Sequence, residues 1–235
     1  MKFTWPWQKK EQHPFLVKNK DWFRNFDQDR PIETYEFVSF DTELTGMNPR
    51  HDQIVSIGAV RIRNLRIVVG ENFSTYVHPT RPLPKDSTLI HRISPEQVRD
   101  APRIEEVLLP FLEFCGDALL LGHYVAMDMS FINRVAKERL GGTIHNPGVD
   151  TMKLAQASVE YERKKHFGIS QPAVSYNLTA LSKRYNLPIF AKHDALEDAL
   201  QTAYLFLYLV RELQLVGCVT LKDFFQVGRL VPRVF

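Results

Sequence analysis

FVSFDTELTG, residues 37–46, joins a short apolar run to a polar turn. Its first four residues read as a buried β-strand, and Gly46 marks the turn that follows. Because side chains alternate along a strand, Asp41 and Glu43 point to the same face. Two carboxylates a few ångströms apart repel each other unless a divalent cation neutralises them. The stretch therefore predicts a strand that ends in a candidate site for a hard metal ion.

The rest of the chain predicts a mixed α/β fold around this strand. Short connections make the strands at 54–62 and 68–77 antiparallel neighbours. Apolar residues then recur at helical spacing over 104–115, and strands alternate with helices beyond it. The further expected elements are a strand at 118–122, a helix at 129–140, a strand-to-helix step at 149–151, a polar basic loop at 160–171, and helices at 178–185 and 194–214. This order implies a mixed sheet with helices packed against it.

The composition of the 235-residue chain excludes several classes of protein. Hydrophobic residues make up 44% and charged residues 24%, values that exclude a wholly disordered chain or a coiled coil. The longest apolar stretch, 203–210, is far shorter than the roughly 20 residues that cross a bilayer. The N-terminus lacks an apolar secretion signal, and the two cysteines form no C-x-x-C motif. We therefore expect a reduced, cytoplasmic, soluble protein.

Charge and aromatic residues are unevenly distributed along the chain. Residues 1–30 account for the whole net charge of +3, so the neutral remainder offers no overall attraction to nucleic acid. All three Trp lie within residues 1–33, and apolar side chains over 15–26 share one helical stripe. Such a segment either packs on the main domain as a flap or docks to a partner or a membrane surface. The expected parts are an aromatic and basic extension at 1–33, a main domain at 34–216 and a tail at 217–235.

Two further acidic motifs open predicted helices. Asp128 follows the strand at 118–122, and His193 with Asp198 opens the last helix. Each motif alone is weak, because a D-x-E pattern is expected by chance about 0.8 times in this chain. Asp is also an ordinary helix cap. The order is what matters: D-x-E on the first strand, one Asp on a middle helix, and His-x4-Asp on the last.

With their flanking residues, these motifs resemble the DEDDh (DnaQ-like) family of 3′–5′ exonucleases, which includes the proofreading epsilon subunit of bacterial DNA polymerase III. The matching stretches are 37–46, DQIVSIGAV at 52–60, HRIS at 91–94, GHYVAMDMSFI at 122–132, DT at 150–151 and HDALEDA at 193–199. The resemblance covers about residues 35–215 and includes every catalytic motif in order. It implies a ribonuclease H-like α/β fold, a mixed sheet with helices on both sides.

The resemblance also implies two divalent metal ions, Mg²⁺ or Mn²⁺, and five catalytic residues. Asp41 would bridge both ions, Glu43 and Asp198 would hold the one that activates water, and Asp128 would support the pair. His193 would be the general base, since an imidazole side chain suits proton removal at neutral pH. On one helix His193 and Asp198 would point about 140° apart, so we expect His193 on the preceding loop. The spacing is that of the histidine subclass rather than of the Tyr-x3-Asp subclass.

Two residues depart from the family pattern without removing a metal ligand. Tyr124 stands where the family usually has Asn, and Met127 stands where it usually has Phe. They leave the local packing around Asp128 and the substrate preference open. The other histidines near motifs, His91 and His123, are expected to serve packing.

Substrate contacts are expected in two places. The resemblance places Thr42, Leu44, Thr45 and Met47 at the substrate, the last three against the 3′-terminal nucleotide. Arg163, Lys164 and Lys165 form the densest basic cluster of the main domain, on a predicted loop. This cluster either contacts the phosphates of a single strand or is an ordinary solvated loop.

The expected function is a metal-dependent 3′–5′ exonuclease that acts on single-stranded or frayed DNA and releases nucleoside 5′-monophosphates. The alternatives are an RNA-trimming 3′–5′ exoribonuclease and a catalytically idle nucleic-acid-binding accessory of a polymerase. A polymerase or repair partner stays open, although the short segment after the last predicted helix favours a stand-alone or accessory nuclease. Contacts with the 2′-hydroxyl, which would separate RNA from DNA, leave no sequence signal.

Overall fold

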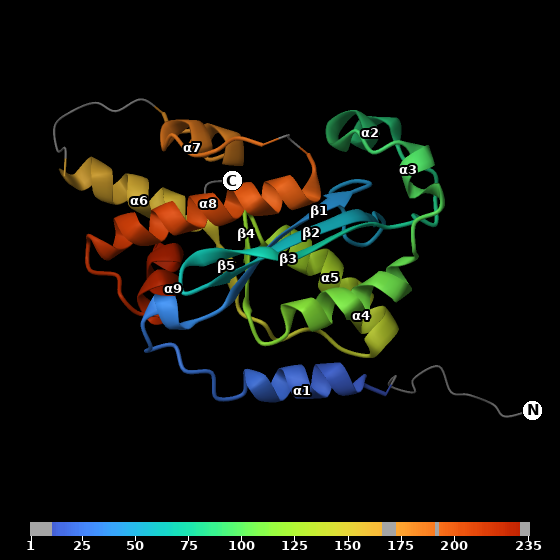
Figure 1. Cartoon of the computed structure of the whole chain (residues 1–235), viewed down its shortest axis with the longest axis horizontal. Coiled ribbons are helices and arrows are strands. Elements are labelled where there is room, and N and C mark those ends of the chain that lie inside the picture. The colour runs from blue at the N-terminus through green and yellow to red at the C-terminus, as the bar shows by residue number, and fades with distance from the viewer. Residues whose placement is uncertain (1–10, 166–172, 191–192, 231–235) are drawn as a thin grey trace, which may run out of the picture.

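The computed structural model describes residues 11–165, 173–190 and 193–230, which fold around a five-stranded sheet (Figure 1). The strands are β1 (Phe37–Leu44), β2 (Ile54–Arg63), β3 (Arg66–Tyr76), β4 (Leu119–Gly122) and β5 (Gly148–Asp150). Their order is β3-β2-β1-β4-β5. β1 pairs antiparallel with β2 and parallel with β4, which in turn pairs parallel with β5. The mixed sheet predicted from the sequence is confirmed, with β1 at its centre.

Helices cover both faces of this sheet, as predicted (Figure 1). The described helices are α1 (Pro14–Trp22), α2 (Lys85–His91), α3 (Pro95–Arg99), α4 (Ile104–Cys115), α5 (Ala126–Leu140), α6 (Thr151–Lys165), α7 (Leu178–Arg184), α8 (Ala195–Gln214) and α9 (Leu221–Leu230). One hydrophobic cluster joins the sheet to α6, α8 and α9, and a second joins it to α4 and α5. The sequence did not predict α2, α3 and α9.

The side chains of β1 alternate between these two clusters. Ser39 faces α8, because its hydroxyl donates a hydrogen bond to the carbonyl of Ala199 at 2.7 Å. Since the strand period is two, Asp41 and Glu43 face α8 as well, and Thr42 faces α5. The alternation of side chains along β1 thus decides which helix each of Asp41, Thr42 and Glu43 faces.

α8 begins in direct contact with the sheet at Gly58 of β2. Gly58 is the register partner of Asp41 on the neighbouring strand. A β-carbon added to Gly58 would lie 2.1 Å from the backbone N of Leu196 and 2.2 Å from the carbonyl carbon of Ala195. Only glycine permits this approach, so the first turn of α8 lies on the sheet beside Asp41.

The described part of the N-terminal extension packs on the main domain. Leu16 and Asn19 of α1 are fully buried. Asn19 Nδ2 donates to Asn146 Oδ1 and its Oδ1 accepts from the backbone N–H of His145, both at 2.7 Å. Of the two interpretations of this segment, the packing favours a flap; Trp5 and Trp7 lie outside the described residues. Among the helices of the described residues, none is long and apolar enough to span a bilayer.

Besides α2 and α3, two segments differ from the predicted secondary structure. Residues 160–165, expected in a loop, continue α6 without a break, because Glu, Arg and Lys are good helix formers and the sequence has no Gly or Pro over 151–167. The remainder of that loop, 166–171, lies outside the described residues. Residues 221–230, expected in a tail, form α9. Leu221, Phe224 and Val227 of α9 are buried in the cluster around α8.

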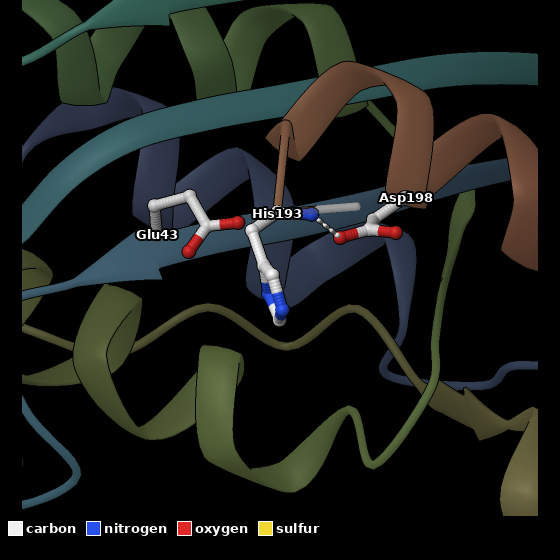
Figure 2. Close-up of side chains that lie close together, drawn as sticks. All are labelled: Glu43, His193 and Asp198. Carbon is white, nitrogen blue, oxygen red and sulfur yellow. Dashed lines mark hydrogen bonds between the residues drawn. The ribbon is translucent and has the colours of Figure 1, made fainter. Parts of the chain in front are cut away.

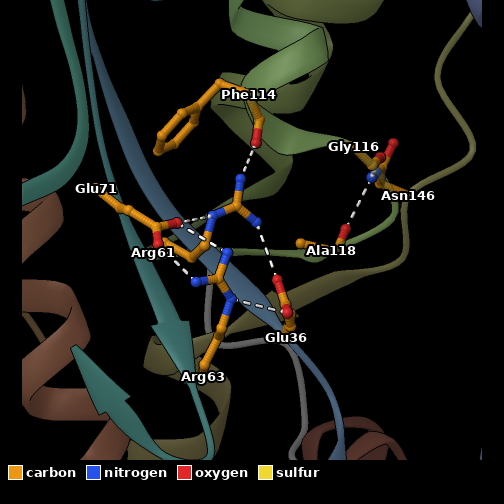
Figure 3. A network of polar contacts seen from close by, with 8 residues as sticks. All are labelled: Glu36, Arg61, Arg63, Glu71, Phe114, Gly116, Ala118 and Asn146. Atoms are coloured by element: carbon orange, nitrogen blue, oxygen red, sulfur yellow. Dashed lines mark hydrogen bonds and ion pairs between the residues drawn. The ribbon is translucent and has the colours of Figure 1, made fainter. Parts of the chain in front are cut away.

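A ring of ion pairs ties the start of β1 to its neighbours (Figure 3). Arg61 and Arg63 of β2 each pair with both Glu36 and Glu71, at N–O distances between 2.6 and 3.2 Å. Arg61 also donates to the carbonyl of Phe114 in the last turn of α4, which has no basic residue of its own. A cation is favourable at such a helix C-terminus. The ring joins β2, β3 and α4 at the end of the sheet away from Asp41 and Glu43.

Candidate active site

Asp128 lies in the first turn of α5 and is tied to β1 through Thr42. The backbone N–H of Thr42 donates to Asp128 Oδ1 at 3.1 Å, and the Thr42 hydroxyl donates to the same oxygen. The Thr42 side chain is buried and points toward α5. Contact between Thr42 and substrate stays a prediction. The two hydrogen bonds hold the Asp128 carboxylate beside the end of β1.

His193 and Asp198 come from the start of α8. Asp194 caps this helix by accepting hydrogen bonds from the backbone N–H groups of Leu196 and Glu197. His193 lies on the preceding turn with a left-handed φ of +62°, which confirms the predicted loop position. Its backbone N–H donates to Asp198 Oδ2 at 3.0 Å (Figure 2). The left-handed turn lets two residues that would diverge on one helix serve the same site.

Glu43, His193 and Asp198 converge from β1 and α8 (Figure 2). One potential ligand atom from each residue lies within 4.8 Å of those of the other two. Glu43 is buried, Asp198 is partly buried and His193 is exposed. Carboxylate oxygens at this spacing can hold a hard divalent cation.

Burial and mutual repulsion raise the pKa values of the acids around this point. Burial raises the pKa of Asp41 well above its ordinary value, and the charges of Asp128 and Glu43 raise it further. Burial, followed by the charges of Asp198 and Asp128, raises the pKa of Glu43 to about 8. Burial raises the pKa of Asp128 to about 6, although the hydrogen bonds from Thr42 lower it. The acids of β1, α5 and α8 therefore lie within electrostatic reach of one another.

We refer to Asp41, Glu43, Asp128 and Asp198 as the carboxylate cluster. In the described parts of the chain, no ion pair joins any of them to Lys or Arg. A divalent cation would relieve the repulsion that raises these pKa values. Mg²⁺ and Mn²⁺ prefer oxygen donors, whereas zinc favours His and Cys, so the cluster fits the first two ions better.

The loop after β1 is organised by Asp52. Asp52 Oδ2 accepts a hydrogen bond from the backbone N–H of Asn48 at 2.8 Å. A β-carbon at Gly46 would lie 2.5 Å from the same carboxylate, so glycine leaves room for this contact. Three residues expected at the 3′-terminal nucleotide belong to this segment: the partly buried Leu44 and Thr45, and Met47, which is 68% exposed. The fold thus presents an exposed apolar side chain on the loop that follows the carboxylate cluster.

The basic cluster of Arg163, Lys164 and Lys165 lies away from these acids. It occupies the end of α6, which Figure 1 shows at the left edge of the molecule, whereas α8 begins right of the centre. Arg163 and Lys164 are exposed. Contact with a distant part of a bound strand stays a prediction for this cluster.

His91, at the end of α2, is a neighbour of the site that sequence reasoning assigned to packing. It is only 4% exposed, which agrees with that assignment. Its Nδ1 accepts the backbone N–H of Ile93 at 3.0 Å, so the neutral ring carries its proton on Nε2. Nε2 is buried and has no hydrogen-bond partner among the described residues. Burial lowers the pKa of His91 and the charge of His193 lowers it further, so the two rings lie near each other.

Residues 38–206 match the protein-family model described as an exonuclease. The chain is 37% identical over 188 residues to the DNA polymerase III PolC-type of Caldanaerobacter subterraneus subsp. tengcongensis, covering 80% of this chain and 12% of that protein. It is 40% identical over 194 residues to the DNA polymerase III subunit epsilon-like protein of Rhodobacter capsulatus, covering 81% of this chain and 26% of that protein. The chain therefore spans about an eighth to a quarter of the length of these relatives.

Solved nuclease structures share the fold. Exonuclease X in complex with 5′ overhanging duplex DNA matches with a TM-score of 0.59 and 25% identity, covering 82% of this chain and 99% of that one. E. coli exonuclease I in complex with a dT13 oligonucleotide matches with a TM-score of 0.65 and 18% identity, covering 77% of this chain and 42% of that one. The second likeness shows the fold alone. Because the family model matches well over half of the chain, the protein belongs to the DnaQ-like exonuclease family with a ribonuclease H-like fold.

Proposed function

We propose that this chain is a metal-dependent 3′–5′ exonuclease that hydrolyses phosphodiester bonds at single-stranded or frayed DNA ends and releases nucleoside 5′-monophosphates. The observation that carries the proposal is the convergence of the carboxylate cluster, from β1, α5 and α8, beside His193. Acids with strongly raised pKa values cluster at functional sites. Its residue types are those that two-metal phosphoryl chemistry requires.

The carboxylate cluster would hold two Mg²⁺ or Mn²⁺ ions. We assign Asp41 to both ions, Glu43 and Asp198 to one of them, and Asp128 to the support of the pair. When bound, two such ions supply an activated water and stabilise the charge on the phosphoryl and leaving oxygens. Thr42 positions Asp128 for this role through the two hydrogen bonds described above.

His193 would take the proton from the attacking water. Its backbone is fixed by the hydrogen bond to Asp198, and its side chain is exposed. An exposed ring on a fixed backbone can rotate toward the water, and imidazole accepts a proton effectively near neutral pH.

The assignment of DNA as the substrate rests on the relatives. Two of them carry the name of DNA polymerase III, and exonucleases X and I were solved with DNA. By extension, we propose the 3′ end of single-stranded DNA as the substrate of this chain and a polymerase or repair complex as its partner.

The test is degradation of single-stranded oligonucleotides labelled at the 5′ end. We expect stepwise shortening from the 3′ end with Mn²⁺ or Mg²⁺, release of nucleoside 5′-monophosphates, and no shortening in EDTA. Asp41→Asn or Asp198→Asn should leave less than about a tenth of the activity, and His193→Ala should lower the rate by roughly 10²–10⁴-fold. Asp117→Asn, an exposed acid just before β4, is the matched control.

Three results would redirect the proposal. Binding of the oligonucleotide without shortening would indicate an idle accessory module. Faster trimming of RNA than of DNA of the same sequence would indicate an exoribonuclease. Shortening from the 5′ end would contradict the proposed polarity.

A further inference from the structure

A pocket of about 440 Å³ lies between the start of α5, the end of β5, the start of α6 and α9. Its walls combine apolar side chains, among them Val125, Met129 and Phe225, with the basic Lys153 and Arg229. The volume lies within the roughly 300–1,000 Å³ of small-ligand sites. The pocket therefore offers apolar surface and positive charge together.

The pocket adjoins the carboxylate cluster through the start of α5. Val125 and Ala126 line the pocket, and Asp128 follows two residues later on the same helical turn. Asp150, which lines the pocket, accepts a hydrogen bond from the backbone N–H of Tyr124 at 3.0 Å. Tyr124 directly precedes Val125 and therefore lies beside this pocket, on the loop that leads into α5.

Tyr124 has a backbone conformation that its residue type disfavours. Its φ is +65°, in the left-handed region, which is unfavourable for a residue with a β-carbon. Asn tolerates this region better than Tyr does. The Tyr124 ring does not recover this cost by burial, because the residue is 49% exposed. A strained and exposed aromatic residue next to a nuclease site suggests a surface for a nucleic-acid base.

The charge of the pocket favours a phosphate. Lys153 and Arg229 are exposed and form no ion pair with a carboxylate of the described chain. The acid that lines the pocket, Asp150, is occupied by two backbone donors, the N–H groups of Tyr124 and Met152. The basic side chains therefore stay available for an anionic ligand.

We propose that Tyr124 and this pocket form a second subsite for the single strand, on the 5′ side of the scissile bond. One base stacks on the Tyr124 ring, and Lys153 and Arg229 contact the adjoining phosphates. This inference rests on the proposed nuclease function and specifies how the enzyme holds the strand beyond the terminal nucleotide.

The first test compares Tyr124→Phe and Tyr124→Asn for binding of oligothymidylate, in an Asp41→Asn background that prevents hydrolysis. Tyr124→Phe keeps the ring and should bind within about twofold of the parent. Tyr124→Asn should weaken binding by roughly 5- to 150-fold, since stacking on an aromatic ring is worth about 1–3 kcal/mol per base. Its melting temperature should not fall, because Asn suits the left-handed φ, and this separates lost binding from lost folding.

The second test measures the salt dependence of oligothymidylate binding. Lys153→Gln with Arg229→Gln should reduce the slope of log K against log salt by about 1.4, from two lost phosphate contacts on a single strand. Lys137→Gln with Arg66→Gln, two exposed residues outside the pocket, is the matched control. Unchanged binding by Tyr124→Asn, or a slope equal to that of the control, would overturn the second subsite. Binding that depends on Tyr124 without any hydrolysis by the parent protein would instead overturn the nuclease proposal alone.

Discussion

Thr42 lies between two acids of β1 but forms hydrogen bonds with a third acid, Asp128 of α5. Its neighbours, Asp41 and Glu43, face α8, whereas its own hydroxyl donates to Asp128 on α5. A hydrogen bond to a carboxylate favours the charged form, and the bonds from Thr42 oppose the effect of burial on the pKa of Asp128. The alternation of side chains along β1 thus brings acids of α5 and α8 into one site.

Thr42→Val tests this link because valine keeps the volume and removes the hydroxyl. We expect the pKa of Asp128 to rise above its value of about 6, since one stabilising hydrogen bond is lost. The acid limb of the pH profile of kcat/KM should move to higher pH, and the rate near pH 7 should fall by about tenfold. Thr42→Ser keeps the donor and should restore the parent profile. A valine variant with an unchanged acid limb would argue against this positioning role.

The start of α8 is the element that completes the site. It supplies Asp198 directly and His193 through the preceding turn, and it rests on β2 only because Gly58 has no side chain. The helix is therefore positioned by a residue that carries no chemistry of its own.

Gly58→Ala should damage activity more than stability. The added carbon meets backbone atoms that cannot rotate away, so α8 must shift, at a cost of about 1–3 kcal/mol in the free energy of unfolding. A shift of the helix moves Asp198 away from Glu43, and we expect activity to fall by more than about tenfold. Urea unfolding and initial rates measure the two effects. Ser74→Ala, the exposed register partner of Gly58 on β3, is the control; equal behaviour of the two variants would contradict the prediction.

α9 belongs to the core that supports α6 and α8. Phe224 is 1% exposed within that cluster, so Phe224→Ala should lower the free energy of unfolding by about 3–5 kcal/mol. Lys222→Ala removes only the exposed ion pair with Asp29 and should change the free energy of unfolding by less than about 1 kcal/mol. Chemical denaturation of both variants checks the prediction, and a Phe224 variant as stable as the Lys222 variant would show that α9 is dispensable.

Local signals explain how much of this architecture the sequence predicts. The central strand, the antiparallel neighbours, α4 and α8 have clear apolar periodicity, and the acidic motifs lie at their ends. α9 repeats apolar residues over only ten residues after a glycine, which is too short a pattern to distinguish from a tail. The prediction of a loop at 160–171 was wrong over 160–165, because a run of charged residues is typical of both a solvated loop and an exposed helix.

Contacts between distant segments were the part of the site that the sequence could not predict. The Thr42–Asp128 hydrogen bonds, the approach of α8 to Gly58 and the nearness of His91 to His193 all depend on the packing of separate elements. Residue types alone do not determine such contacts.

For the whole molecule, the carboxylate cluster makes stability depend on pH and metal. The raised pKa values mean that the folded chain binds more protons than the unfolded chain, in which Glu titrates near about 4.3. Without metal, the free energy of unfolding should therefore fall as the pH rises from about 4 toward about 8, the pKa of Glu43. Mn²⁺ or Mg²⁺ should reverse this fall, because it binds the folded state.

Melting temperatures in EDTA and in Mn²⁺ across this pH range test the expectation. Asp41→Asn should flatten the curve in EDTA and raise the melting temperature at alkaline pH, since one repelling charge is absent. A metal-free melting temperature that rises with pH would contradict the predicted linkage.

The alternation of β1 also bears on how such a gene can change. Loss of the codon between Ser39 and Asp41 would shift the rest of the strand by one residue. Asp41 and Glu43 would then face α5, and Thr42 would face α8. A point substitution changes one side chain of the site, but a single-codon deletion there displaces all three of these side chains in one step. Length changes in this strand should therefore be far rarer among functional descendants than changes of residue type.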